Sequence, residues 1–259
     1  MTTVLLREDR EGVCTLTLNQ PDRFNPLSEQ MLDALGEALD EAAVDSSVRA
    51  LVLAARGKAF CAGHDLREMR ASPSPQYYRW LFRRCSAVMM KIVTVPKPVI
   101  ARVQGLATAA GCQLVASCDL AVASSDASFA ASGITLGLFC STPGVALSRN
   151  VARKKSFEML MTGDFISAQD AERHGLVNHV VDPAQLDSRV TKLCVDILRH
   201  PQVAISAGKR LFYSQLEKDL ASAYEQAAEV MACNMMDQDT LDGVQAFLDK
   251  RPTPWREGD

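Results

Sequence analysis

Val103-Gln-Gly-Leu-Ala-Thr-Ala-Ala-Gly-Cys-Gln-Leu114 is the stretch of sequence that decides the fold. The β-rich run 99–103 leads into it, and its small residues, 107–111, lead directly into a helical segment. Free N–H groups at the start of a helix, helped by the helix dipole, favour an oxygen atom that gains negative charge. The stretch therefore predicts a strand, a tight turn and a helix whose first amides can hold such an oxygen.

An earlier stretch follows the same plan, Gly57-Lys-Ala-Phe-Cys-Ala-Gly-His-Asp-Leu-Arg67. An N–H group from this turn, paired with those at the helix start, would make an oxyanion hole. A helix start rich in Gly and Ala also occurs where two backbones simply pack closely. Each stretch by itself leaves both interpretations open, and their order along the chain favours the binding site.

The pattern along the chain predicts an α/β protein, because short β-rich runs alternate with helical segments. Strands are expected at 13–18, 48–54, 99–103 and 120–123. Helices are expected after a Ser28 cap, over 76–94 and after a Ser167 capping box. Beyond residue 143 we expect nearly continuous helix, with helices around 202–213, 218–235 and 238–249. We therefore predict a core over 1–195 and a helical C-terminal lobe over 196–259.

Composition excludes several classes of protein. The 259 residues are 47% hydrophobic, and 28 Lys and Arg face 31 Asp and Glu, a net charge of -3 without a basic block. Nucleic acid is therefore not an expected partner. No apolar run approaches the ~20 residues that a membrane span needs, so no membrane association is expected.

The cysteines and histidines do not follow metal-site spacings. The eight cysteines include no CxxC pair, and the four histidines form no HExxH-like pair. We expect reduced, buried thiols and no metal. The first residues are not an Arg-rich transit peptide. The expected location is therefore the cytoplasm of a bacterium, or the mitochondrial matrix if this is a trimmed eukaryotic chain.

Several motifs, in order, resemble the crotonase (enoyl-CoA hydratase/isomerase) superfamily from about Val4 to Arg251. Besides the two turns they are Leu18-Asn-Gln-Pro-Asp-Arg-Phe-Asn-Pro-Leu27, Met161-Thr-Gly-Asp164, Ile166-Ser-Ala-Gln-Asp-Ala171, Gly175-Leu-Val and Ala246-Phe-Leu-Asp-Lys-Arg-Pro252. Three phrases are similar to the subgroup of enoyl-CoA hydratase domain-containing protein 3: Phe60-Cys-Ala-Gly-His-Asp-Leu66, Gly105 to Asp119, and Gly137-Leu-Phe-Cys-Ser-Thr-Pro-Gly-Val-Ala-Leu147.

This resemblance implies the ClpP/crotonase fold, in which repeated ββα units form a core of two perpendicular sheets, with a helical C-terminal trimerisation lobe. It implies an acyl-CoA or enoyl-CoA thioester as ligand and a homotrimer or a dimer of trimers as the assembly. The exposed-looking apolar faces of the C-terminal helices also favour oligomers. No separate cofactor is implied, because coenzyme A is part of the substrate.

The resemblance places the oxyanion amides on the backbone of His64 and Ala110. The family usually has glycines at 109 and 110, and alanine is acceptable there only if φ stays negative. The hydratases of the family carry two glutamates that activate water, and this chain has Gln113 and Gly133 at those positions. Neither residue can act as a general base, so ordinary hydration is not expected.

Other candidate groups lie near these positions. Ser141 stands where dehalogenases of the family carry a nucleophilic aspartate, or it only begins a helix before Pro143. The His64 imidazole could move a proton, or it faces away and pairs with Asp65. Asp65 is expected to organise the turn or cap the next helix. Cys61, Cys112 and Cys140 are expected to be packing residues.

The resemblance also implies how coenzyme A is held. Arg23 and Lys250, the latter from a neighbouring subunit, would bind its phosphates, although both can equally be solvated surface charges. The channel around the thioester would be lined by Ala62, Asp65, Leu66, Leu106 and Gly111.

Three functions remain open on these residues. The chain can be an enzyme that stabilises a thioester enolate, such as an isomerase or a hydratase with a displaced base. It can be a pseudo-enzyme that binds acyl-CoA without catalysis. The third possibility is a CoA thioester hydrolase in which His64 activates water.

Overall fold

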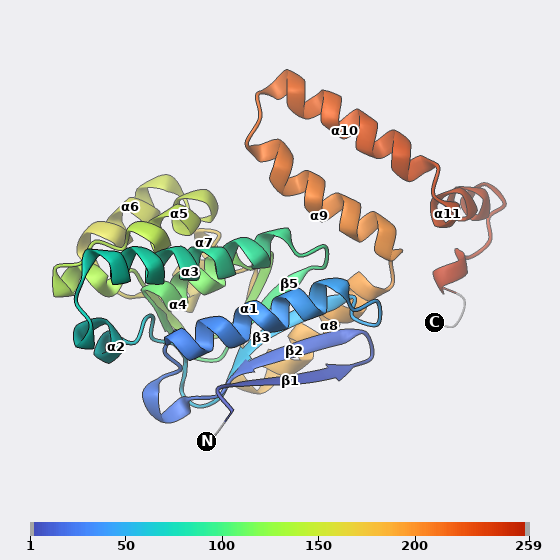
Figure 1. Cartoon of the computed structure of the whole chain (residues 1–259). Coiled ribbons are helices and arrows are strands. Elements are labelled where there is room, and N and C mark those ends of the chain that lie inside the picture. Colours follow the sequence, from blue (N-terminus) through green and yellow to red (C-terminus); the bar gives the residue numbers. More distant parts are fainter. Residues whose placement is uncertain (1–2, 257–259) are drawn as a thin grey trace.

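The computed structural model describes residues 3–256, and its strands form two sheets (Figure 1). The six-stranded sheet has the order β1-β2-β3-β5-β7-β10, and the four-stranded sheet the order β4-β6-β8-β9. The strands are β1 Leu5–Arg10, β2 Val13–Leu18, β3 Ala50–Ala55, β4 Ala59–Cys61, β5 Val99–Val103, β6 Leu106–Thr108, β7 Leu120–Ser124, β8 Ser128–Ala130, β9 Ile166–Ser167 and β10 His179–Val181.

Successive strands alternate between the two sheets. β3, β5 and β7 lie side by side in the large sheet, and each is followed at once by β4, β6 or β8 of the small one. β4 and β6 are parallel, with Ala59 opposite Leu106 and Cys61 opposite Ala107. Because the carboxyl ends of parallel neighbours meet at one edge, the turns that follow β4 and β6 emerge next to each other.

Helices connect these strand pairs and form the last quarter of the chain. Their bounds are α1 Glu29–Val44, α2 Leu66–Ala71, α3 Pro75–Thr94, α4 Ala110–Ser117, α5 Ser141–Asn150, α6 Arg153–Thr162, α7 Ala168–Arg173, α8 Leu186–Leu198, α9 Gln202–Leu216, α10 Leu220–Met235 and α11 Gln238–Leu248. Short 3-10 helices cover Pro21–Arg23, Ser132–Leu136, Pro183–Gln185 and Pro254–Arg256. The predicted caps are confirmed, since Ser28 and Ser167 accept N–H groups of Met31 and Asp170.

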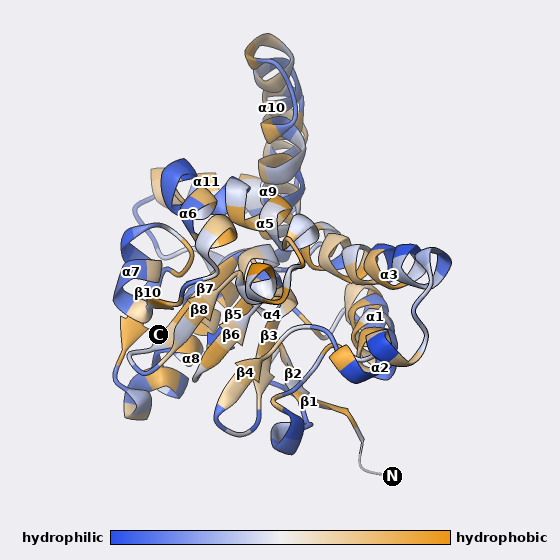
Figure 2. Ribbon diagram, turned by 90° about the vertical axis from the view of Figure 1, so that its left-hand side faces the viewer, coloured by the Kyte–Doolittle hydropathy of each residue, from blue (hydrophilic) through white to orange (hydrophobic). Residues whose placement is uncertain are grey.

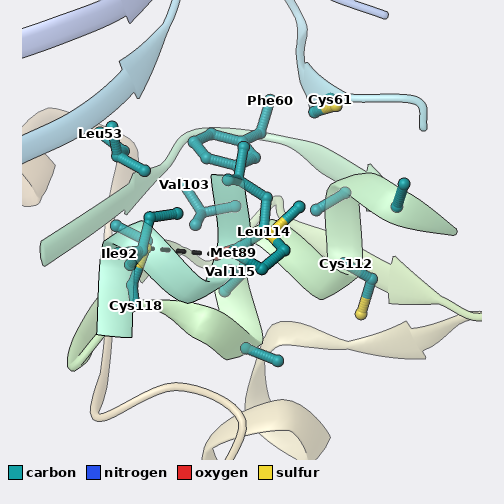
Figure 3. Packing of buried hydrophobic residues seen from close by; sticks show 14 of the residues in the cluster. Leu53, Phe60, Cys61, Met89, Ile92, Val103, Cys112, Leu114, Val115 and Cys118 are labelled. Atoms are coloured by element: carbon teal, nitrogen blue, oxygen red, sulfur yellow. Dashed lines mark hydrogen bonds between the residues drawn. The ribbon is translucent and has the colours of Figure 1, made fainter. Parts of the chain in front are cut away.

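The central strands of the large sheet, β3, β5 and β7, are buried on both faces, which explains their largely apolar sequences. On one face Val52, Ile100 and Val122 pack against α8. On the other face lies the main core, where Figure 3 shows residues of β4, α3 and α4 gathered around Phe60, Met89 and Leu114. Figure 2 shows the hydrophobic strands inside and hydrophilic residues along the outer helices. α4 is thus enclosed, and all of its residues are buried.

The C-terminal helices stand away from the sheets. Figures 1 and 2 both show α9 and α10 as a projecting helical hairpin, with α11 beyond it. The proposed boundary at 195/196 falls within α8, so a lobe defined by whole helices begins after Leu198. In the described part of the chain, no helix has the length and apolar character to cross a membrane.

Two parts of the predicted pattern needed correction. The strand expected at 48–54 runs from Ala50 to Ala55. The region beyond residue 143 is not continuous helix, because it contains β9 and β10. These short strands exist by pairing with β8 and β7, which lie far away in sequence. A two- or three-residue strand has no periodicity that a sequence pattern could show.

Candidate functional site

The turn after β4 is held by a distant segment. Gly63 has φ +93°, a conformation that favours glycine. Its carbonyl accepts the N–H of Leu27 at 2.8 Å, and the Ala62 N–H donates to the Phe24 carbonyl at 3.0 Å. Leu27 and His64 form an isolated parallel bridge. The segment 24–27 therefore fixes the backbone of this turn on one side and leaves the opposite side open to α4.

The turn before α4 adopts an unusual backbone conformation. Ala109 caps the helix with φ 50° and ψ -120°, and its N–H donates to the Ala130 carbonyl at 3.0 Å. The condition that φ stays negative is met at Ala110 but not at Ala109. Holding a residue with a Cβ in such a region costs about 1–3 kcal/mol. The turn is therefore strained, and its contacts with the surrounding strands hold it in this conformation.

The two turns touch each other. A Cβ on Gly63 would lie 3.1 Å from the Ala109 Cβ and 3.3 Å from the Ala110 nitrogen. A Cβ on Gly111 would overlap the Cys61 carbonyl. The helix therefore approaches β4 as closely as backbones allow. Within residues 3–256, neither the His64 N–H nor the Ala110 N–H donates a hydrogen bond, so both are free to bind a ligand.

The two positions at which the family resemblance implies glutamates have different surroundings. Gln113 is buried, with 4% of its surface exposed, and its Oε1 has no hydrogen-bond partner among the described residues. Gly133 has no room for a side chain, because a Cβ there would lie 2.6 Å from the Leu138 carbonyl oxygen and 2.8 Å from the Cys140 Sγ. A glutamate at 113 would fit the available space, whereas one at 133 would require the 138–140 loop to move.

The His64 imidazole lies between Leu27 and α3. Its Nδ1 is 3.4 Å from the Leu27 carbonyl oxygen, and its ring meets Phe82 edge-on at 5.6 Å between centroids. Its Nε2 is buried and has no partner in the described chain. The predicted alternative of a pair with Asp65 is wrong, because the hydrogen bonds of Asp65 go elsewhere. Burial lowers the pKa of the imidazole, and the Leu27 carbonyl opposes this shift.

Asp65 organises the turn, as expected. Its Oδ1 accepts the Arg67 N–H at 3.0 Å and caps α2, and its carboxylate forms an ion pair with Arg23. The Asp65 side chain is 4% exposed and that of Arg23 is 44% exposed. Arg23 therefore neutralises a buried carboxylate, and only part of its guanidinium faces solvent. This pairing was not apparent from the sequence, since the two residues are far apart along the chain.

Arg67 is a further cation at this place that the sequence analysis left out. Its side chain is exposed on the first turn of α2, two residues after Asp65. The signal was present in the motif His64-Asp65-Leu66-Arg67, where a basic residue directly follows the oxyanion turn. An exposed guanidinium at this position can contact a phosphate group.

The candidate nucleophiles lack activation. Ser141 is exposed at the start of α5, and its Oγ lies 3.4 Å from the Phe139 carbonyl oxygen. No basic side chain among residues 3–256 forms a hydrogen bond with it. Burial raises the pKa of the Cys61 and Cys112 thiols to about 12, so both stay protonated at neutral pH. Ser141 therefore begins a helix, and Cys61 and Cys112 are buried packing residues.

The remaining candidate residues lie either beside the two turns or near the C-terminal end of the chain. Ala62 and Leu106 are half-buried beside the two turns, and Leu66 is 54% exposed. Lys250 follows α11 with φ 56°, and α11 lies far from α4 within one chain (Figure 1). It could reach a thioester site only in another subunit. No group of His, Cys, Asp or Glu side chains suited to a metal occurs in the part of the chain that the structure describes.

The fold and these turns are those of the enoyl-CoA hydratase/isomerase family, whose model matches residues 8–258. The chain belongs to this crotonase superfamily and, within it, to the subgroup of enoyl-CoA hydratase domain-containing protein 3. The mitochondrial protein of that name from Rattus norvegicus is 44% identical over 246 residues, which cover 95% of this chain and 82% of the relative.

Solved structures agree with this assignment. An enoyl-CoA hydratase from Mycobacterium smegmatis has 62% identity and a TM-score of 0.96, covering 97% of this chain and 98% of that one. The human enoyl-CoA hydratase domain-containing protein 3 has 43% identity and a TM-score of 0.94, with coverages of 97% and 100%. The predicted crotonase fold is confirmed.

Proposed function

We propose that this protein binds acyl-CoA or enoyl-CoA thioesters and stabilises an enolate-like form of them. The thioester oxygen accepts the N–H groups of His64 and Ala110. The observation that carries the proposal is the contact between the two turns, which brings two free amides together at the start of a buried helix. Such donors stabilise a developing oxyanion, and the loss of one typically costs about 3–4 kcal/mol.

The test removes the acceptor from the ligand. Calorimetry compares butyryl-CoA with S-butyl-CoA, a thioether that lacks the carbonyl group. We expect the thioester to bind more tightly by about 1–3 kcal/mol, the value of a buried hydrogen bond. Equal affinities would contradict the oxyanion assignment, and no binding of either compound would contradict the function. Ala110→Pro would delete one of the two N–H groups, but it is a less suitable test than the thioether. Proline disfavours the ψ of -120° that the preceding residue Ala109 has.

The same proposal predicts slow hydration. Gln113 accepts no proton at neutral pH, and the space around Gly133 excludes a second carboxylate. Crotonyl-CoA turnover should fall below the ordinary enzyme range of ~1 to 10³ s⁻¹. Gln113→Glu is the variant that can restore a carboxylate, since Gly133→Glu would disturb the loop around Leu138. Rapid hydration by the wild type would reveal another base.

A binding-only function is the second candidate, and the absence of both carboxylates favours it. Thioester hydrolysis with His64 is a third, which the buried imidazole does not specifically support. Mass spectrometry after incubation with acyl-CoA and enoyl-CoA thioesters separates these possibilities. A shifted double bond or a water adduct identifies enolate chemistry, free coenzyme A identifies hydrolysis, and unchanged thioester identifies binding alone.

The assembly and the coenzyme A contacts belong to the same proposal. α9 and α10 expose large apolar side chains, among them Phe212, Leu216, Leu220, Tyr224 and Met231. Burying these faces in a homotrimer or a dimer of trimers would let Lys250 of a neighbour join Arg23 and Arg67 near the phosphates. Light scattering should report three or six chains, and a monomer at micromolar concentration would contradict this. Relatives named as mitochondrial make the matrix one expected location, and the bacterial cytoplasm the other.

A further inference from the structure

Gln113 carries a polar group that the folded chain leaves without a partner. We propose that it determines specificity, and that its carboxamide holds a hydroxyl or oxo group on the second or third carbon of the acyl chain. The ligand would then be an acyl-CoA with a polar substituent near the thioester. This inference rests on the proposed thioester site and adds the class of acyl group to it.

The first step is the burial of the amide. Gln113 is 4% exposed, and its Oε1 forms no hydrogen bond within residues 3–256. Buried polar side chains in folded proteins nearly always have partners, so such an orphan calls for an explanation. A carboxamide presents an acceptor and a donor and can exchange them by rotation. A hydroxyl group matches either orientation, and an oxo group matches the donor.

The second step is the direction of the side chain. Side chains on an α-helix lean toward its N-terminus and cover the preceding turn. On α4 that preceding turn contains Ala109 and Ala110, whose free N–H would hold the thioester oxygen. The amide of Gln113 therefore lies over the place where the first carbons of the acyl chain would extend from the thioester.

The third step is that the neighbouring polar groups are already used. The Thr108 hydroxyl bonds to the Ser132 hydroxyl at 2.6 Å and lies 3.3 Å from the Ala130 carbonyl. The Ser117 hydroxyl donates to the backbone oxygen of Gln113 at 2.8 Å and not to its amide. None of these hydroxyls bonds to the Gln113 amide, so a ligand is the partner that suits it.

The opposite turn supports the same conclusion. His64 supplies one of the two free amides, and its Nε2 is also buried without a partner. α4 and the opposite turn thus each carry one orphan polar side-chain atom. An unsubstituted aliphatic acyl chain would leave the atom on Gln113 unsatisfied, whereas a hydroxylated one can satisfy it. The neutral amide binds the substituent and takes no proton from it.

Calorimetry of the full-length protein tests the proposal with four thioesters: butyryl-CoA, 2-hydroxybutyryl-CoA, 3-hydroxybutyryl-CoA and acetoacetyl-CoA. We expect at least one substituted thioester to bind about five- to tenfold more tightly than butyryl-CoA. In Gln113→Leu the preference for substituted thioesters over butyryl-CoA should disappear. Gln113→Met repeats the test if the leucine variant does not fold. Gln30→Leu, at an exposed position on α1, is the control and should keep the preference.

The outcomes distinguish a failure of the Gln113 specificity role from a failure of the proposed thioester binding. If butyryl-CoA binds the wild type and all four affinities are equal, a bound water satisfies Gln113 and the specificity role is overturned. A preference that survives in Gln113→Leu and Gln113→Met overturns it as well. If no thioester binds the wild type, the proposed function itself fails.

Discussion

The buried polar groups at the two ends of the α4 segment differ in their hydrogen bonding. Beyond the C-terminal end, Asp119 accepts hydrogen bonds from Lys209 Nζ at 2.7 Å, Tyr213 OH at 2.7 Å and the Val99 N–H at 2.6 Å. At the N-terminal end, Ala109 is strained and the Gln113 oxygen has no partner. Satisfied groups hold a fold together, while strain and orphan groups gather where a ligand completes the structure.

The Asp119 cluster also joins two regions of the chain. Lys209 Nζ donates to the carbonyls of Ile92 and Lys97 at 2.8 and 2.9 Å, in addition to Asp119. It thereby fixes α9 to the end of α3 and to β5. The comparison predicts that changes at this cluster lower stability, whereas changes at the Gln113 end alter binding and leave or raise stability.

Lys209→Met should have the largest effect. It leaves the Asp119 carboxylate buried without its cation, and removing one partner of a buried ion pair costs about 3–5 kcal/mol. The free energy of unfolding in urea measures the loss. Lys218→Met is the matched control at an exposed position, and it should change stability by less than about 0.5 kcal/mol. Equal changes in the free energy of unfolding for the two variants would show that the Asp119 cluster does not stabilise the fold.

Tyr213→Phe should come next. It removes the hydroxyl that donates to Asp119 and keeps the ring, so the expected loss is about 1.5–3 kcal/mol, the value of a hydrogen bond to a charged group. Urea unfolding again gives the number. A neutral result would mean that the other donors alone satisfy the carboxylate.

Ala109→Gly tests the strain at the other end. Relief of about 1–3 kcal/mol outweighs the backbone entropy of glycine, about 0.5–1 kcal/mol, so the variant should be about 1 kcal/mol more stable. Ala116→Gly, inside the same helix, is the control and should be less stable by about 1 kcal/mol. Destabilisation by both substitutions would contradict the strained conformation of Ala109.

Gln113→Leu should raise the stability of the ligand-free protein by about 1 kcal/mol. It replaces an unsatisfied buried amide by an apolar group of similar volume, which removes a desolvation penalty. The expected change in stability has the opposite sign to that of Tyr213→Phe. Thermal unfolding without ligand measures this change in stability. A clear loss of stability would show that the amide has a partner within the protein.

His64→Gln should have the smallest effect, and only in acid. Burial lowers the pKa of the folded imidazole, so below about pH 6.5 the unfolded state binds the proton more readily and stability falls. Above this pH both states are neutral and the group contributes no slope. The variant should flatten the stability profile below pH 6.5. Identical profiles from urea unfolding at pH 5 to 8 would refute the shift.

Local sequence patterns were sufficient for much of the fold. The strands Val13–Leu18 and Val99–Val103 have the predicted bounds, and α3 begins one residue before its predicted start. Alternation, helical spacing and caps depend on neighbours within a few residues, which the sequence lists directly. The two small-residue turns and their order were also sufficient to indicate the superfamily.

The sequence by itself thus determined most of the elements and the superfamily, and it has Gln113 and Gly133 where the family resemblance implies glutamates. Only the tertiary structure decided that Ala109 takes a positive φ, that no side chain fits at Gly133, and that Arg23 pairs with Asp65. Each of these facts depends on a contact between segments far apart in the chain. A buried group such as Gln113 is likewise known to lack a partner only when every residue folded around it has been placed.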